Sequence, residues 1–195
     1  AITPDPEEVG GPDGVLDWTR GCLAHGVRLI RLRADSLDET GLIDLAGNFR
    51  RIAAEFGARW LLDGSPQLAE QLGADGVHID EGELRKLSGR PLNDDFLVGA
   101  FCHSEAQLAR AGELALDFVT LPVVPDQADA QPVDRDAFAR LCRQSPLPVY
   151  ALGGVAFEDL ERTREHGGFG VAGTRGFTVQ PRSFGERRRG SGDQA

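Results

Sequence analysis

Short apolar runs alternate with amphipathic stretches along most of this chain, and this alternation constrains the fold more than any other feature. Between the runs, apolar residues recur at helical spacing, most clearly from Leu42 to Phe56. Strands that alternate with helices form parallel sheets with right-handed crossovers. The sequence predicts eight strands, at Ala1–Thr3, Val27–Arg33, Ala58–Leu62, Gly76–Ile79, Phe96–Cys102, Asp117–Leu121, Pro148–Leu152 and Gly170–Ala172.

Eight such units predict an α/β fold, a compact (β/α)8 TIM barrel, over residues 1–177. The chain has 195 residues, slightly short for this fold, and a doubly wound open sheet is the alternative. No apolar helical stripe follows Gly176, so we expect the eighth helix to be weak or missing. Residues 178–195 are predicted to form a polar, flexible tail, with Arg187–Arg189 as a solvated charge run.

Composition excludes several classes of protein. Lys and Arg number 21 against 31 Asp and Glu, a net charge of −10, which argues against a nucleic-acid partner. No apolar run approaches the roughly 18 residues of a membrane span, and no secretory signal pattern is present. Three dispersed cysteines predict free buried thiols and a cytoplasmic location, with no cysteine metal site. The chain contains no methionine, so we expect either a longer parent polypeptide or missing modified residues.

Two arginines end the second predicted strand. Period-two alternation places Arg31 and Arg33 on one face and the apolar Ile30 and Leu32 on the other. The helix-facing side of a barrel strand is apolar, so both arginines should point into the barrel mouth. Buried guanidinium groups need an anionic partner. That partner is either a phosphate-bearing ligand or a neighbouring carboxylate such as Asp63 or Glu83.

Glycine-rich turns follow the last two predicted strands. Gly153 and Gly154 follow one strand, and Gly173, Thr174 and Arg175 follow the next. Such turns let backbone N–H groups approach a phosphate closely, and barrels commonly bind phosphate at this place. The alternative interpretation is plain tight turning.

Two histidines stand at strand ends, where barrel enzymes carry out their chemistry. His103 follows the fifth predicted strand and His78 lies near the end of the fourth. Either could serve as a general acid or base, and either could instead be a packed structural histidine. We expect His103 to be the catalytic residue.

Several segments resemble thiamine phosphate synthases and their TenI-type relatives, in order along residues 1–177. The segment GADGVHIDEGEL resembles the GADGVHLGQ-x-DL stretch of that superfamily, and LVGAFCHSEAQLARA resembles its G-x-S-x-H stretch. PVYALGGV and GVAGTRG resemble its two phosphate-binding turns. ITPDP and RLIRLRA resemble its first strand and its Q-L-R-x-K strand.

The resemblance implies a synthase that joins hydroxymethylpyrimidine diphosphate to a thiazole phosphate, with Mg²⁺ and basic side chains neutralising the departing diphosphate. The chain departs from the pattern at those positions. Gly64 and Ser65 replace the metal-binding Asp and the Arg of an N-D-R turn, and Asp35 replaces the strand Lys. Glu83 stands where a second metal carboxylate falls. The loop LPVVPDQADAQP lacks the usual Thr and Lys and adds Asp126 and Asp129.

What the resemblance retains is Arg33, His103 and the two phosphate turns. These favour the TenI-type branch, whose tautomerase members shift a proton on a thiazole phosphate carboxylate. We therefore expect a barrel for a small phosphorylated heterocycle, bound also by Arg31, Asp63 and His78. The alternatives are an active synthase, which would need Mg²⁺, and a non-catalytic ligand-binding domain of the kind fused behind Nudix hydrolases. A cofactor is expected only in the synthase case, and the oligomeric state stays open.

Overall fold

The computed structural model describes residues 1–123 and 135–177. The predicted polar tail at 178–195, the predicted weakness of an eighth helix, and Asp126 and Asp129 lie outside these described residues. All statements below concern the described part of the chain.

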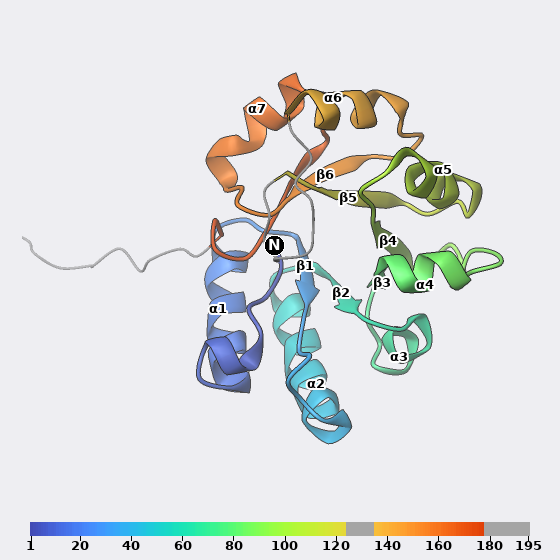
Figure 1. The fold of residues 1–195 in the computed structure, drawn as a ribbon. Helices are drawn as coiled ribbons and strands as arrows, with labels where there is room; N and C mark the ends of the chain where they lie inside the picture. Colours follow the sequence, from blue (N-terminus) through green and yellow to red (C-terminus); the bar gives the residue numbers. More distant parts are fainter. Residues whose placement is uncertain (124–134, 178–195) are drawn as a thin grey trace, which may run out of the picture.

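The core of the fold is one parallel sheet whose strands follow each other in sequence order from β1 to β7. The sheet curls, and the helices lie around its outside (Figure 1). A doubly wound sheet would reverse its strand order at a switch point. Consecutive neighbours throughout confirm the TIM-like barrel and exclude the open sheet. The strands are β1 Leu29–Leu32, β2 Arg59–Asp63, β3 Gly76–Ile79, β4 Leu97–Phe101, β5 Phe118–Pro122, β6 Val149–Leu152 and β7 Gly170–Ala172.

The prediction of a first strand at Ala1–Thr3 was wrong, because this segment forms no regular strand. Only Ile2 pairs there, in an isolated parallel bridge with Arg31. The N–H of Ile2 also donates to the carbonyl of Gly173 at 2.9 Å, so this segment lies between β1 and the end of β7. Pro4 follows and has no N–H with which to continue a ladder. The described part of the barrel therefore has seven strands, and a single bridge at Ile2 stands in place of the predicted first strand.

Helices lie between the strands, and α2 covers the amphipathic stretch predicted from Leu42 to Phe56. In chain order they are η1 Pro6–Glu8, α1 Pro12–Ala24, α2 Glu39–Glu55, α3 Pro66–Gln71, α4 Glu81–Lys86, α5 Glu105–Glu113, α6 Arg135–Gln144, η2 Phe157–Asp159 and α7 Leu160–Glu165. Helix α1 was not predicted, although Pro12 at its first turn is a start signal. Its buried face includes Val15, Cys22 and Leu23.

The apolar layer between sheet and helices forms as the alternation predicts. Ile30 and Leu32 of β1 are fully buried, whereas Leu29 and Arg31 are not. Helix α2 buries Phe49 against the sheet, where its ring meets that of Trp60 with centroids 5.5 Å apart. This layer holds the helices on the outer face and leaves the inner face for other side chains.

Aromatic rings fill part of the barrel interior, and glycines in the strands make room for them. A Cβ on Gly99 would lie 2.2 Å from the Phe118 ring, and one on Gly170 would lie 2.7 Å from the Tyr150 ring. The two rings meet edge to face with centroids 5.5 Å apart. These glycines are therefore a packing requirement of the interior rather than a turn signal.

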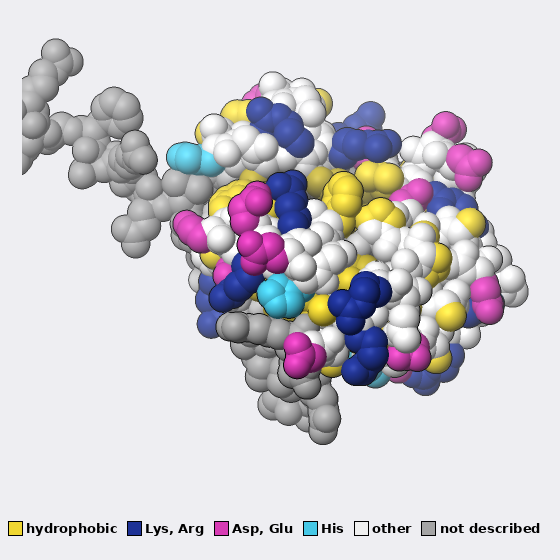
Figure 2. Space-filling view, turned by 90° about the horizontal axis from the view of Figure 1, so that it is seen from above, with side chains coloured by type: hydrophobic (Ala, Val, Ile, Leu, Met, Phe, Trp, Pro, Cys, Tyr) yellow, Lys and Arg dark blue, Asp and Glu magenta, His cyan; other side chains and the backbone are white. Residues whose placement is uncertain are grey.

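The surface charges, the helices and the cysteines of the described residues can be compared with what the composition predicts. Figure 2 shows one face on which basic and acidic side chains are interspersed, with hydrophobic side chains between them. None of the described helices is long and apolar enough to cross a membrane. Cys22, Cys102 and Cys142 are free and buried, and burial raises the pKa of the Cys102 thiol to about 12.

Candidate functional site

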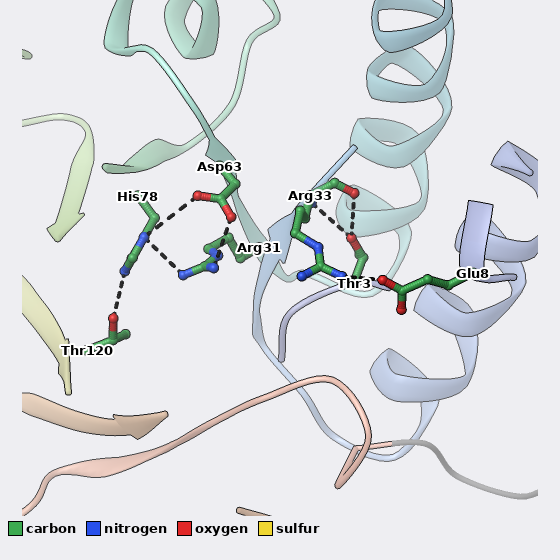
Figure 3. Close-up of polar contacts among 7 residues, drawn as sticks. All are labelled: Thr3, Glu8, Arg31, Arg33, Asp63, His78 and Thr120. Carbon is green, nitrogen blue, oxygen red and sulfur yellow. Dashed lines mark hydrogen bonds and ion pairs between the residues drawn. The ribbon is translucent and has the colours of Figure 1, made fainter. Parts of the chain in front are cut away.

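A chain of polar side chains crosses the barrel interior from β1 to β5. Arg31 donates from Nη2 to Asp63 Oδ2 at 2.9 Å and from Nη1 to His78 Nδ1 at 2.9 Å. The Nε2 atom of His78 lies 3.1 Å from the hydroxyl oxygen of Thr120 (Figure 3). A guanidinium can only donate, so His78 accepts at Nδ1 and carries its proton on Nε2. We refer to these four residues as the interior network.

Burial governs the charges of the interior network. Burial, and to a smaller degree the Arg31 guanidinium, lowers the pKa of His78 well below its ordinary value, so this imidazole is neutral near pH 7. Burial raises the pKa of the Asp63 carboxyl, while Arg31 acts in the opposite direction. Burial likewise lowers the pKa of Arg31, but a guanidinium stays charged in proteins. Arg31 and Asp63 therefore neutralise each other inside the barrel.

Arg33 is held at the rim rather than in the interior. Its Nη2 donates to Glu8 Oε1 of η1 at 2.7 Å. Its backbone N–H donates to the Thr3 hydroxyl at 2.9 Å, and that hydroxyl lies 3.2 Å from the Arg33 carbonyl. Both predicted inward arginines thus have carboxylate partners within the chain, Asp63 for Arg31 and Glu8 for Arg33.

A cavity of about 190 Å³ opens beside the interior network. Arg31, His78, Thr120 and Tyr150 give it polar groups, and aromatic and aliphatic side chains supply most of the remaining wall. Burial raises the pKa of the Tyr150 hydroxyl. A mostly apolar hollow with a few polar groups is the usual form of a small-molecule site. His103 does not line this cavity.

His103 lies at the barrel mouth, two residues beyond the end of β4, and its side chain is 43% exposed. Its Nε2 atom lies 2.9 Å from Glu81 Oε2 and 3.3 Å from the side-chain amide nitrogen of Gln107. The Ser104 hydroxyl caps α5 by accepting from the Gln107 N–H, and the Gln107 side-chain carbonyl accepts from the His103 N–H at 2.7 Å. The His103 backbone is therefore fixed while its ring stays accessible.

The two glycine-rich turns follow β6 and β7 and lie side by side. Gly153 and Gly154 have φ of 85° and 60°, which favour glycine. A parallel bridge joins Ala156 to Gly176, the residue that follows Thr174 and Arg175 in the second turn. A Cβ on Gly176 would lie 2.3 Å from the Val155 carbonyl oxygen, so the two turns approach too closely for a side chain there. This arrangement brings both predicted phosphate turns to one place on the rim.

Comparison with known proteins identifies the superfamily. The family model described as thiamine monophosphate synthase matches residues 1–177. A putative thiamine-phosphate synthase of Geobacter sulfurreducens is 35% identical over 173 residues, covering 86% of this chain and 81% of that protein. The chain belongs to the thiamine monophosphate synthase family. The resemblance of the sequence motifs to this family is thereby confirmed.

A second relative and a solved structure are also similar to this chain. The thiamine-phosphate synthase of Thermus thermophilus is 29% identical, covering 80% of this chain and 77% of its own. The thiamine phosphate pyrophosphorylase of Pyrococcus furiosus superposes with a TM-score of 0.76 at 17% identity, covering 92% of this chain and 86% of that one. At that identity the superposition supports the barrel fold alone.

The described residues do not fit the magnesium ion that the family resemblance implies. Glu83 is paired with Lys86 at 2.7 Å, and Asp63 is paired with Arg31. Ser65, at the position of the family Arg, caps helix α3. Within residues 1–123 and 135–177, no three His, Cys, Asp or Glu side chains gather as metal ligands would. We therefore derive no chemical step through a metal.

Three contacts of the site were missed by sequence reasoning: Glu8, Glu81 and Thr120. Thr120 could have been found, because alternation along its strand places it on the inner face with Phe118. Glu81 follows β3 and Glu8 precedes β1, and they pair with His103 and Arg33 over 22 and 25 residues. No local sequence pattern predicts pairs that are so far apart in the chain.

Proposed function

We propose that this barrel binds a small phosphorylated heterocycle of thiamine synthesis at its mouth. The observation that carries the proposal is the bridge between Ala156 and Gly176, which holds the two glycine-rich turns together. The phosphate would lie against backbone N–H groups near Gly153, Gly154 and Thr174, where a barrel ordinarily takes a phosphate.

Calorimetric titration tests this phosphate site. A thiazole phosphate should bind at least tenfold more tightly than its unphosphorylated alcohol. Gly176→Ala should abolish most of that preference, because the added Cβ would collide with Val155. Gly89→Ala is the matched control, since nothing lies within 4 Å of its added Cβ. Equal affinity of the parent chain for phosphate and alcohol would overturn the proposal.

For the reaction, we propose proton transfer on the bound ring by His103. A ring C–H bond breaks, its proton moves to an imidazole nitrogen, and the electron pair passes into the ring. The proton then returns to another ring atom, so the step is a tautomerisation that needs no other reactant. The exposed, backbone-fixed His103 at the mouth supports this role.

Exchange of ring hydrogen for solvent deuterium measures this reaction. His103→Gln should abolish the exchange while leaving the calorimetric affinity for the phosphate within about twofold. Binding without any exchange in the parent chain would contradict the catalytic role and favour a non-catalytic ligand-binding domain.

A second candidate is the synthase reaction, favoured by the names of the relatives, which are thiamine-phosphate synthases. Against it stand Gly64 and Ser65 at the metal and arginine positions of the resemblance. Each lost electrostatic contact of this kind costs about 10²–10³ in rate. We therefore expect weak or absent release of diphosphate from hydroxymethylpyrimidine diphosphate and thiazole phosphate. Mg²⁺-dependent turnover near the ordinary range of about 1–10³ s⁻¹ would establish the synthase instead.

A further inference from the structure

We propose that Glu81 is a positioning residue, which keeps the proton of neutral His103 on Nε2 and leaves Nδ1 to exchange a proton with the ligand. The inference rests on the proposed acid/base role of His103. It adds a residue to that role and names the reacting nitrogen.

Two side chains compete for Nε2 of His103. Glu81 Oε2 at 2.9 Å can only accept a hydrogen bond, whereas the amide nitrogen of Gln107 at 3.3 Å can only donate one. The orientation of Gln107 is set by its other end, because its carbonyl accepts from the His103 N–H at 2.7 Å. A protonated Nε2 can donate to Glu81, and an unprotonated Nε2 can accept from Gln107, so each tautomer forms only one of the two hydrogen bonds. The shorter, charged contact favours Glu81 and places the proton on Nε2.

Glu81 is itself held in place on helix α4. Its Oε1 atom accepts from Arg85 Nη2, one helical turn away, at 2.5 Å. Asp80 caps the helix by accepting from the Glu83 N–H. With one oxygen bound to Arg85, the carboxylate presents Oε2 to the imidazole. Arg85, Glu81 and His103 thus form a second polar chain, at the mouth rather than in the interior.

Both partners remain open to a ligand. The Glu81 side chain is 37% exposed, and the His103 ring packs only loosely against Phe101, with centroids 6.2 Å apart. An exposed imidazole would otherwise rotate and sample both tautomers. Glu81 therefore orients the ring of His103, as Arg31 and Thr120 orient the ring of His78.

The test is the tautomer of His103, measured by long-range ¹H–¹⁵N NMR on the ligand-free chain at a pH where the ring is neutral. The parent chain should show mainly the Nε2–H form. Glu81→Ala leaves only the Gln107 amide beside Nε2, so the Nδ1–H form should increase at least threefold. The double variant Glu81→Ala/Gln107→Ala removes both competitors and should return toward the free-histidine mixture. Glu113→Ala, which breaks a similar exposed pair with Arg110, is the control and should leave the tautomers unchanged.

Kinetics supply a second measurement. Glu81→Ala should lower kcat for deuterium exchange by at least about tenfold, because the ring loses its fixed orientation as well as part of the Nε2–H form. This is a part of the roughly 10²–10⁴ that general acid–base catalysis supplies, and KM should stay nearly constant. Glu81→Gln keeps a carbonyl acceptor and should restore much of that loss. Tautomer populations that do not change in Glu81→Ala overturn the inference. Absence of exchange in the parent chain overturns the proposed function instead.

Discussion

The barrel interior and the barrel mouth hold the same residue types under opposite conditions. His78 in the interior is 3% exposed and is bound by Arg31 and Thr120. His103 at the mouth is 43% exposed and is bound by Glu81. His78 lies in the C-terminal half of β3, and His103 lies two residues beyond the end of the neighbouring strand β4.

Solvent access is what separates them. In the interior, every polar group needs a partner within the chain, and the resulting network fixes its own protonation. At the mouth, water and a ligand can replace a protein partner. We therefore expect the interior network to contribute more to stability than the exposed pair at the mouth, where the proposed proton exchange would take place.

The largest expected effect is the difference in stability loss between variants of Arg31, which lies in β1, and of Arg33, which directly follows β1. Arg31→Met removes the partner of the buried Asp63 and of His78, and should lower the free energy of unfolding by roughly 3 kcal/mol. Arg33→Met breaks a more exposed pair with Glu8 and should cost about 0.5 kcal/mol. Urea denaturation at pH 7 measures both. Equal losses would show that interior and rim do not differ as described.

Packing of the interior gives the next effect. Gly99→Ala would place a Cβ 2.2 Å from the Phe118 ring, and overpacking of this kind costs about 1–3 kcal/mol. Gly89→Ala has open space around it and should change stability by less than about 0.5 kcal/mol. A tolerated Gly99→Ala would mean that the interior rings rearrange easily.

The pH dependence of stability should come in part from His78. Its pKa is lowered by burial in the folded state, so between the unfolded value near 6.5 and that lower value only the unfolded chain binds the proton. Stability should therefore fall on acidification below about pH 6.5, by up to about 1.4 kcal/mol per pH unit from this group. In His78→Gln the slope should be smaller, although the variant is less stable at pH 7.5. Equal slopes in denaturation series from pH 7.5 to 5.5 would contradict this assignment.

The smallest expected effect on stability is at the mouth. His103→Gln should change the free energy of unfolding by no more than about 0.5 kcal/mol, because the ring is exposed and its partners reach water. The same variant is expected to lose proton exchange. A loss of stability comparable to that of His78→Gln would show His103 to be structural.

The sequence by itself determined the barrel and most of its layers. Short-range periodicity is enough to place Ile30 and Leu32 against the helices, because alternation along a strand is a local property. The family motifs also belong to contiguous segments, and they predicted both glycine-rich turns. Helix α1 shows how far such local patterns can predict structure. Its buried face includes the polar Thr19 and also Cys22, so no clear apolar stripe predicted a helix there.

Only the tertiary structure decided which charged groups meet. Asp63 and Glu83 were both candidate partners of Arg31, and the pairing of β1 with β2 brings Asp63 to it. Glu83 lies on α4, where Lys86 is its partner. Glu81 and His103 are 22 residues apart and meet because the segments after β3 and β4 end at the same rim. Such contacts depend on which parallel strands lie side by side in the sheet, and no local pattern of residues encodes that order.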